Sequence, residues 1–520
     1  MSLVSVIFLF ADCKKEAAKS KTATDTTTVT NNGSTNQIPL KNMFGVNVYE
    51  WNFLGPADGT VINEANMGLI QSFSAVRHYM DWQKLEYTEG NYTFNPTYDG
   101  GWSYDAMYTR CKQAGILVLA DLKNTPPWLV DTYPVAAQEV DVVPIAYGAN
   151  KSDPASYIKQ AKAAFQFAAR YGANIAVDKT LVTVNTTPAW TGQAANQVKI
   201  GLGLVKYIEC NNEEDKWWEE IETQQTPEEY AANMSAFYDG NMGKLGKNVG
   251  VKNADPNMIV VMGGLASNDP TWVTRMINWC KTNRGYKADG SVNLCFDVIN
   301  YHYYPNVSNG GVDAGVAPEL SQAGTIADSF VSVANSMATH PEVWITESGY
   351  DINQASDQHA IAIGSKSVLI TQADWILRSA LLYMRHGLAR SFFYQLFDDT
   401  PNGTTTYQTS GLAVEGAGRR PAADYILQTT KLMGTYTYVK TISTDPLVDQ
   451  YQSGSKTIYV LMIPDQKGRT GTYTLTTANN NALTLYNLKV GADAMTSTQV
   501  TPANNKLTIN VSETPVFVGN

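Results

Sequence analysis

The sequence predicts an α/β protein, a (β/α)8 barrel of the TIM type followed by a small C-terminal antiparallel β-sandwich. Three observations favour this fold. The chain has 520 residues, enough for one such barrel and one small domain. From Asn42 onward, short β-branched runs alternate with amphipathic stretches, as expected for parallel strands that are each followed by a helix. After Gly434 the pattern changes to short alternating runs separated by turn residues.

Eight runs are the predicted strands of the barrel. They are Phe44–Val48, Ala75–Tyr79, Ile116–Asp121, Tyr207–Asn212, Ile259–Gly263, Phe296–Tyr301, Glu342–Thr346 and Ser391–Gln395. The clearest predicted helices are Ser156–Tyr171, Pro227–Leu245, Gly324–Ala338, Ser367–Met384 and Pro421–Met433. The alternative is an open doubly wound sheet. No GxGxxG follows any of these runs, which disfavours the dinucleotide-binding form of that alternative.

Residues 435–520 are predicted to form the β-sandwich, which leaves residues 40–434 for the barrel. Predicted strands of the sandwich include Thr457–Met462, Thr472–Thr476, Leu483–Leu488 and Lys506–Val511. Clusters rich in Asp, Gly, Asn and Pro separate these strands, as is typical of turns.

The first 39 residues are predicted to lie outside both domains. Residues 1–13 contain the apolar run Leu3–Ala11 and then Cys13, which resembles a bacterial lipoprotein export signal. Residues 14–39 are rich in Thr, Asn, Ser and Lys and are expected to be a flexible linker. We therefore expect a secreted protein or a bacterial outer-membrane or cell-surface lipoprotein, anchored to the membrane only by a lipid on Cys13.

Composition narrows the classes of partner. The formal net charge of -10 disfavours binding to nucleic acid or anionic lipid but does not oppose a neutral ligand. Five histidines and five cysteines without a CxxC pair do not make a convincing metal site. We expect no cofactor and no metal, four of the cysteines as small buried side chains, and a monomeric protein.

Two glutamates follow predicted strands at opposite sides of the barrel. Glu213 comes after the fourth strand and Glu347 after the seventh. In such a barrel the carboxyl ends of the strands form one face, and catalytic residues of TIM-barrel enzymes lie there. Two facing carboxyl groups are what hydrolysis of a glycosidic bond needs, because one protonates the leaving oxygen and the other attacks the anomeric carbon or activates water. These two residues are the predicted catalytic pair.

The segments around both glutamates resemble the signatures of glycoside hydrolase clan A. Ile208-Glu209-Cys210-Asn211-Asn212-Glu213 is similar to the strand-4 signature, in which an Asn-Glu pair supplies the acid/base. Trp344-Ile345-Thr346-Glu347-Ser348-Gly349 is similar to the strand-7 signature of the nucleophile. The resemblance covers about residues 40 to 435, with families 39, 30 and 5 the most similar. The C-terminal sandwich resembles the β-domain of families 30 and 39. The resemblance implies a retaining enzyme with Glu213 as acid/base and Glu347 as nucleophile.

The same resemblance implies further residues that bind substrate. Arg77 matches the strand-2 Arg that bonds the nucleophile, and Asn212 matches the Asn that binds the sugar 2-hydroxyl. His302 and Tyr304 match the strand-6 residues that line the cleft, with Tyr304 preferred over Tyr303. Trp128, in a Pro-Pro-Trp segment after strand 3, and Trp217 and Trp218, after the acid/base, are expected to stack on sugar rings.

The sequence departs from the clan's pattern at two places. Most members have a Trp at the end of strand 8, whereas this chain offers Tyr394, Gln395 or Phe397, and Gln395 is included among the predicted substrate-binding residues. Glu214 directly follows Glu213, so the position after the strand offers two adjacent candidates for the catalytic acid. We prefer Glu213 because Asn212 immediately precedes it.

The predicted function is endo-hydrolysis of a β-linked glycan, with β-glucan first and β-xylan or β-galactan next, by double displacement. Retention requires the carboxyl groups to lie about 5–5.5 Å apart, whereas inversion requires about 6.5–9.5 Å. Two alternatives remain at this point. One is an exo-acting β-glycosidase such as a β-xylosidase. The other is a non-catalytic surface protein that binds glycans.

Overall fold

The computed structural model describes residues 38–519, except residues 56, 310 and 311. The predicted export segment, Cys13 and nearly all of the predicted linker lie outside the described residues. Within the part of the chain that is described, no helix is long and apolar enough to cross a membrane.

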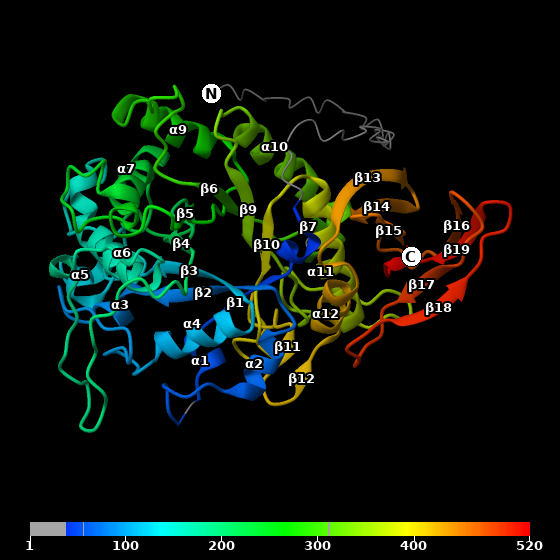
Figure 1. Ribbon diagram of the computed structural model, residues 1–520, viewed down its shortest axis with the longest axis horizontal. Helices are drawn as coiled ribbons and strands as arrows, with labels where there is room; N and C mark the ends of the chain where they lie inside the picture. Colours follow the sequence, from blue (N-terminus) through cyan, green and yellow to red (C-terminus); the bar gives the residue numbers. More distant parts are fainter. Residues whose placement is uncertain (1–37, 56, 310–311, 520) are drawn as a thin grey trace, which may run out of the picture.

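A closed barrel of eight parallel strands forms the first part of the molecule, which confirms the predicted fold class (Figure 1). Its strands are β1 (Gly45–Val48), β2 (Ala75–Asp81), β3 (Leu117–Lys123), β4 (Tyr207–Cys210), β5 (Ile259–Met262), β6 (Val298–His302), β9 (Glu342–Glu347) and β10 (Arg390–Phe393). β1 pairs in parallel with both β2 and β10, which closes the ring and excludes an open sheet. β4 and β9 are therefore the fourth and seventh strands of the barrel.

A helix follows each barrel strand. These helices are α2 (Glu64–Ile70), α4 (Tyr104–Gln113), α6 (Ile158–Tyr171), α7 (Pro227–Asp239), α9 (Thr271–Asn283), α10 (Ala323–Asn335), α11 (Val368–Arg385) and α12 (Pro421–Met433). Short helices in the connections are α1 (Glu50–Phe53), α3 (Trp82–Leu85), α5 (Pro127–Val130) and α8 (Val251–Ala254). The prediction that one helix extends from Pro227 to Leu245 is wrong at its end, because Gly240 adopts a left-handed φ of 64° and caps α7 after Asp239.

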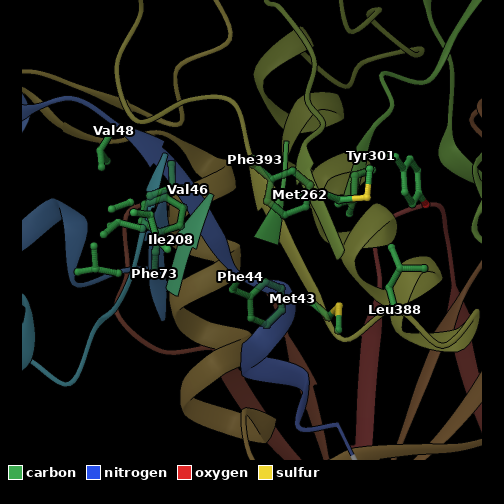
Figure 2. Packing of buried hydrophobic residues seen from close by; sticks show 14 of the residues in the cluster. Met43, Phe44, Val46, Val48, Phe73, Ile208, Met262, Tyr301, Leu388 and Phe393 are labelled. Atoms are coloured by element: carbon green, nitrogen blue, oxygen red, sulfur yellow. The ribbon is translucent and has the colours of Figure 1, made fainter. Parts of the chain in front are cut away.

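The main hydrophobic core lies between the barrel strands and the surrounding helices. Figure 2 shows part of this cluster, including Val46, Ile208 and Met262 from three strands and Leu388 from the segment before β10. These strand residues alternate with others that point into the barrel, because successive side chains of a strand lie on opposite faces. The four cysteines among the described residues are buried, and none of them forms a disulfide bond.

The C-terminal part is an antiparallel β-sandwich, as predicted. Its six-stranded sheet has the order β13 (Thr437–Thr444), β14 (Leu447–Ser453), β15 (Lys456–Met462), β20 (Val516–Gly519), β17 (Leu483–Asn487) and β18 (Thr496–Val500). A second layer is the pair β16 (Gly471–Thr476) and β19 (Lys506–Val511). Two further two-stranded pairs are β7 (Asn306–Asn309) with β8 (Val312–Gly315) and β11 (Ala413–Val414) with β12 (Gly418–Arg419).

The six-stranded sheet is buried on both faces at its centre. Along β15, Val460 and Met462 pack into the core shared with the barrel, whereas Leu461 packs against β16 and β19. Polar contacts join the same two parts, including a buried ion pair in which Nη2 of Arg385 on α11 lies 2.7 Å from Asp449 on β14. The sandwich is therefore packed against the helical side of the barrel, to the right of it in Figure 1.

Candidate active site

The interior of the barrel changes from apolar to polar along the strands. Near the amino ends it holds Ala75, Leu119, Tyr207, Val261, Trp344 and Phe392. Closer to the carboxyl ends, the interior holds buried polar side chains that are joined by hydrogen bonds. They are Asn47, Arg77, Asp121, Glu209, Asn300 and Thr346. The titratable groups therefore gather toward the carboxyl ends of the strands, where barrel enzymes carry out their chemistry.

Arg77 is the centre of this polar layer. Its guanidinium is fully buried and contacts three carboxyl groups, on Glu209 (2.7 Å), Asp121 (3.0 Å) and Glu347 (2.9 Å). Burial raises the pKa of Asp121 well above its ordinary range despite Arg77, and Oδ1 of Asp121 has no hydrogen-bond partner. The Arg77 guanidinium thus links the carboxyl groups of Asp121 and Glu209 to that of Glu347. Arg77 therefore fixes the position of Glu347 from below.

Glu347 is held by three donors at the end of β9. Arg77 Nη1 donates to Oε1, the Tyr304 hydroxyl donates to Oε2 at 2.8 Å, and the Tyr79 hydroxyl also donates to Oε1. Burial alone raises the pKa of this carboxyl, but the nearby His302 and Arg77 together with the two hydroxyls outweigh it and leave the pKa below its ordinary value. Glu347 is consequently an ionised, oriented carboxylate, as a nucleophile must be.

Glu213 faces Glu347 and is paired with His302. Nδ1 of His302 lies 2.7 Å from Oε1 of Glu213, and Nε2 lies 2.9 Å from the Thr346 hydroxyl. Burial alone lowers the pKa of His302, but the Glu347 and Glu213 carboxylates outweigh it and raise the pKa above its ordinary value. The Glu213–His302 hydrogen bond therefore carries one proton, on either the imidazole or the carboxyl group.

Glu213 and Glu347 approach each other across the mouth of the barrel. One carboxylate oxygen of each, together with a ring nitrogen of His302, lie within 4.8 Å of one another. The backbone of Glu213 has a left-handed φ of 55°, and Asn211 has one of 63°. Such conformations cost about 1–3 kcal/mol each in non-glycine residues and gather at functional sites. The turn after β4 thus directs the Glu213 side chain toward Glu347.

The neighbouring Glu214 points elsewhere. It is buried beside Lys216 and Asn211 in a separate small cavity of about 70 Å³. Its Oε2 has no hydrogen-bond partner, and burial raises its pKa to about 7. Of the two adjacent glutamates, Glu213 is therefore the one that shares a cavity with Glu347.

A cavity of about 560 Å³ lies over the two carboxylates. Its wall comes from the ends of six barrel strands and from the loops after them, and consists of Tyr79, Asn212, Glu213, Trp217, Trp218, Ala266, Asn268, His302, Tyr303, Tyr304, Asn306, Glu347, Tyr394 and Tyr407. Trp217 and Trp218 are 63% and 53% exposed, and their rings meet edge to face. A cavity with carboxylates at its base and flat aromatic side chains on its rim suits a sugar.

Most of the predicted site residues meet at this cavity. Glu213, Glu347, Asn212, His302, Tyr304 and Trp217 line it, and Arg77 lies directly beneath it. Asn212 accepts a hydrogen bond of 2.8 Å from Arg77. The Tyr304 hydroxyl donates to the Glu347 carboxylate, whereas Tyr303 contacts Glu347 only through its backbone N–H, which donates to the Glu347 carbonyl.

Two predicted substrate contacts are not brought to this cavity. Trp128 packs edge to face on Trp82, and its indole N–H donates to the carbonyl of Glu86 at 2.9 Å. Gln395 is buried, and its amide donates to Asp399 at 2.6 Å. Both residues donate these hydrogen bonds within the protein, and neither lines the cavity.

Sequence reasoning missed Tyr79 and Tyr407 of the cavity, whereas Tyr394 was one of three residues offered for the end of strand 8. Tyr79 lies two positions after Arg77 on β2, so the alternation of a strand places both on the inner face, and this signal was sufficient to find it. Tyr394 lines the cavity in place of the expected Trp at the end of strand 8. Tyr407 comes from a long loop after β10, and its ring contacts Tyr304 and Tyr394. No periodic pattern in the sequence marks it.

Glu213, His302 and Glu347 are the single group of side chains, among those described, with the spacing of metal ligands. Their surroundings do not fit a cation. Oε1 of Glu347 already accepts from Arg77 and Tyr79, and Oε2 accepts from Tyr304. A metal would displace these donors and lie close to a buried guanidinium, so the group is better suited to proton transfer than to metal binding.

No protein-family model and no curated protein matches the sequence, but solved structures do. A family 39 glycoside hydrolase from Bacteroides cellulosilyticus WH2 has a TM-score of 0.59 at 16% identity, over 92% of this chain and 81% of that one. A family 51 α-L-arabinofuranosidase from Bifidobacterium longum has a TM-score of 0.54 at 12% identity, over 93% and 96%.

A GH30 endoxylanase from Clostridium papyrosolvens C71 is also similar, with a TM-score of 0.51 at 13% identity over 93% of this chain and 97% of that one. The matched share is larger than the barrel alone, so the likeness extends into the C-terminal sheets. The chain is thus structurally similar to glycoside hydrolases of families 39, 30 and 51, and it has the fold of glycoside hydrolase clan A.

Proposed function

We propose that the protein is a retaining glycoside hydrolase that cleaves a β-linked glycan by double displacement. Glu347 is the nucleophile and Glu213 is the acid/base. The observation that carries the proposal is the pair of carboxylates within 4.8 Å across one cavity, one of them ionised and oriented by Arg77. So close an approach of one oxygen from each carboxyl group supports the separation of about 5–5.5 Å between the groups in retaining enzymes over the roughly 6.5–9.5 Å in inverting ones.

The contacts supply a role for each group. Ionised Glu347 attacks the anomeric carbon while the proton held between Glu213 and His302 moves through Glu213 to the leaving oxygen. The glycosyl-enzyme ester then reacts with water, and Glu213 takes the water's proton as the bond to Glu347 breaks. Arg77, Tyr79 and Tyr304 hold Glu347 in one orientation, which reduces the entropy lost on reaching the transition state.

The rim of the cavity supports endo action on a neutral chain. Trp217 and Trp218 follow Glu213 and are exposed, so they offer flat faces for sugars on the leaving side of the bond. A protein with a net charge of -10 disfavours a polyanionic glycan. β-Glucan is the first candidate substrate and β-xylan or β-galactan the next.

The decisive experiment replaces each carboxyl group and follows turnover on these three polysaccharides. Glu347→Gln should lower kcat by about 10⁴-fold or more and leave binding of the substrate intact, because it removes the nucleophile and preserves the shape of the site. Glu214→Gln is the matched control, since it alters the adjacent carboxyl group outside the cavity and should keep turnover within about tenfold of the parent protein.

Two further measurements test the assigned roles. Glu213→Ala should lose most activity on polysaccharide yet keep much of its kcat/KM on aryl glycosides with a very acidic leaving phenol, because kcat/KM reports the first step and that phenol leaves without a proton. Proton NMR of the first product should show the β-anomer. An α-anomer as the first product, or full activity in Glu347→Gln, would contradict the mechanism. Binding without any turnover in the parent protein would favour a glycan-binding protein instead.

A further inference from the structure

A second cavity lies beside the catalytic one. It has a volume of about 680 Å³, and Asn353, Asp398, Asp399 and Asn402 belong to its wall. Tyr394 lines the catalytic cavity, and its hydroxyl lies 3.5 Å from Oδ2 of Asp399. The loop after β10 contributes to both cavities, with Tyr407 in the first and Thr409 in the second. The two spaces are thus adjacent, with Tyr394 and Asp399 at their common border.

The proposed reaction indicates which end of the substrate reaches this second cavity. The leaving part of the substrate lies on the side of Glu213, because that residue protonates the leaving oxygen, and Trp217 and Trp218 are on the same side. The retained sugar lies over Glu347. Tyr394 bounds the catalytic cavity away from Trp217, on the last strand of the barrel, so a chain that continues past the retained sugar heads toward Asp399.

Asp399 offers a free acceptor at the border with the catalytic cavity. Arg420 binds both oxygens of Asp398, at 2.9 and 2.5 Å. Asn66 donates to Glu415 at 3.0 Å. Asp399, by contrast, is exposed and receives one close hydrogen bond, from Gln395 to Oδ1, while the Tyr394 contact to Oδ2 is long. Oδ2 can therefore accept from a hydroxyl group of a ligand.

The charges around the cavity select among ligands. Three acidic side chains, Asp398, Asp399 and Glu415, line the space with one basic side chain, Arg420, which pairs with Asp398. A carboxylate accepts strong hydrogen bonds from hydroxyl groups and repels another carboxylate. A neutral sugar fits these walls, and a uronic acid does not.

We propose that this cavity binds the sugar next to the retained one, that it takes neutral sugars and rejects uronic acids, and that Asp399 determines both properties. The inference rests on the proposed glycosidase function and narrows it to neutral chains of at least three sugars. It makes Asp399 a specificity-determining residue that does not touch the reacting atoms.

The test compares chain lengths in full-length Glu347→Gln, which binds without turnover. Calorimetric titration uses the disaccharide and pentasaccharide of whichever series the parent protein hydrolyses: cello-, xylo- or β-1,4-galacto-oligosaccharides. Adding Asp399→Ala should weaken pentasaccharide binding about tenfold and change disaccharide binding less than about twofold. Asp357→Ala, an exposed carboxylate outside both cavities, is the matched control and should change neither.

A second set of titrations tests how the charge of the ligand affects binding. A β-1,4-glucuronic acid pentasaccharide should bind Glu347→Gln at least tenfold more weakly, roughly, than the neutral pentasaccharide, and adding Asp399→Asn should narrow that difference. An equal effect of Asp399→Ala on both chain lengths, no effect at all, or tight binding of the uronic acid would overturn the inference while turnover by the parent protein upheld the proposed function. No hydrolysis of any of the three series would remove the proposed function and the inference together.

Discussion

The ionisation of Glu347 depends on three donors from two parts of the barrel. Arg77 and Tyr79 lie on β2, and Tyr304 follows β6. Their bonds, with the nearby His302, offset the effect of burial and keep the pKa of Glu347 low. Activity that requires ionised Glu347 is then present above this lowered pKa and is lost only when the pH falls through it.

Removing one donor should shift the acid side of the pH profile. In Tyr79→Phe the carboxylate loses a hydroxyl donor, so its pKa rises and activity should disappear at a higher pH than in the parent protein. We expect kcat near neutral pH to fall by about tenfold or more, because hydrogen bonds to charged groups contribute roughly 1.5–3 kcal/mol. Profiles of kcat and of kcat/KM against pH measure the fall in kcat and the shift of the acid limb.

Tyr303→Phe is the control for that experiment. The Tyr303 ring lines the same cavity, but its hydroxyl accepts from the backbone of Gln322 and not from a catalytic group. Its acid limb should match the parent protein. The alkaline limb should be unchanged in both variants, because neither hydroxyl contacts His302. An unmoved acid limb in Tyr79→Phe would show that Tyr79 does not control Glu347.

At the scale of elements, the end of β5 is shaped by a close approach to β6. A Cβ built on Gly264 would overlap the ring of His302. Gly264→Ala should therefore push His302 away from Glu213 and lower kcat by about 10²-fold, because small displacements of catalytic groups are costly. Activity measurements with a crystal structure of the variant check this expectation.

Gly68→Ala provides the comparison. Gly68 lies in α2, and a Cβ there meets nothing within 4 Å. Activity should be unchanged and stability should increase by about 0.5–1 kcal/mol, since glycine disfavours a helix interior. Equal activity in the two alanine variants would show that the position of His302 does not matter to the reaction.

A second element-scale feature is the buried charge at the start of α1. Glu50 is fully buried and contacts Lys84 of α3 at 2.6 Å and His78 of β2 at 3.4 Å. Burial alone raises its pKa, but His78 and Lys84 outweigh it and leave the pKa at about 2. Because the folded value is depressed, the stabilisation is present above about pH 4.3 and is lost as the pH falls toward 2.

Lys84→Met should reveal this pair in thermal unfolding. At pH 7 the variant leaves Glu50 without its lysine partner, and we expect a loss of about 3–5 kcal/mol. At pH 4 the difference from the parent protein should shrink, because Glu50 can take up a proton in the variant. A difference that stays constant between the two pH values would contradict the assigned charge of Glu50.

The elements that the sequence predicted well are those with strong local patterns. All eight barrel strands lie within a few residues of their predicted positions, because each is a short β-branched run between turn residues. Glu213 and Glu347 were found because they end such runs. Arg77 and His302 followed from the same positional argument together with the family resemblance.

The residues that were misplaced depend on how loops pack. Trp128 looks like a platform for sugars in the sequence, but its position is fixed by contacts with Trp82 and Glu86 that are distant in the chain. Tyr407 reaches the cavity through a loop whose path no local pattern specifies. Asp121 and Glu209 had no apparent role in the sequence until the closed barrel brought them to Arg77.

For the molecule as a whole, the sandwich and the barrel share one interface. Val460, Met462 and Phe517 from the sandwich belong to the same hydrophobic cluster as the barrel helices. Arg385 and Asp449 form a buried ion pair across the interface, whereas Arg419 and the exposed Asp493 form a pair at its edge. We therefore expect the two parts to unfold together in a single transition.

Two aspartate variants in the sandwich test this coupling through the barrel. All eleven tryptophans precede residue 435, so tryptophan fluorescence reports on the barrel alone. Asp449→Ala leaves Arg385 buried without its partner and should destabilise the protein by about 3–5 kcal/mol. The midpoint of the fluorescence transition should then fall by several degrees, together with the calorimetric midpoint. Asp493→Ala should change stability by about 1 kcal/mol or less, because Asp493 is itself exposed. If Asp449→Ala lowered a calorimetric transition and left the fluorescence midpoint unchanged, the barrel would be stable without the sandwich, and the shared core would not couple them.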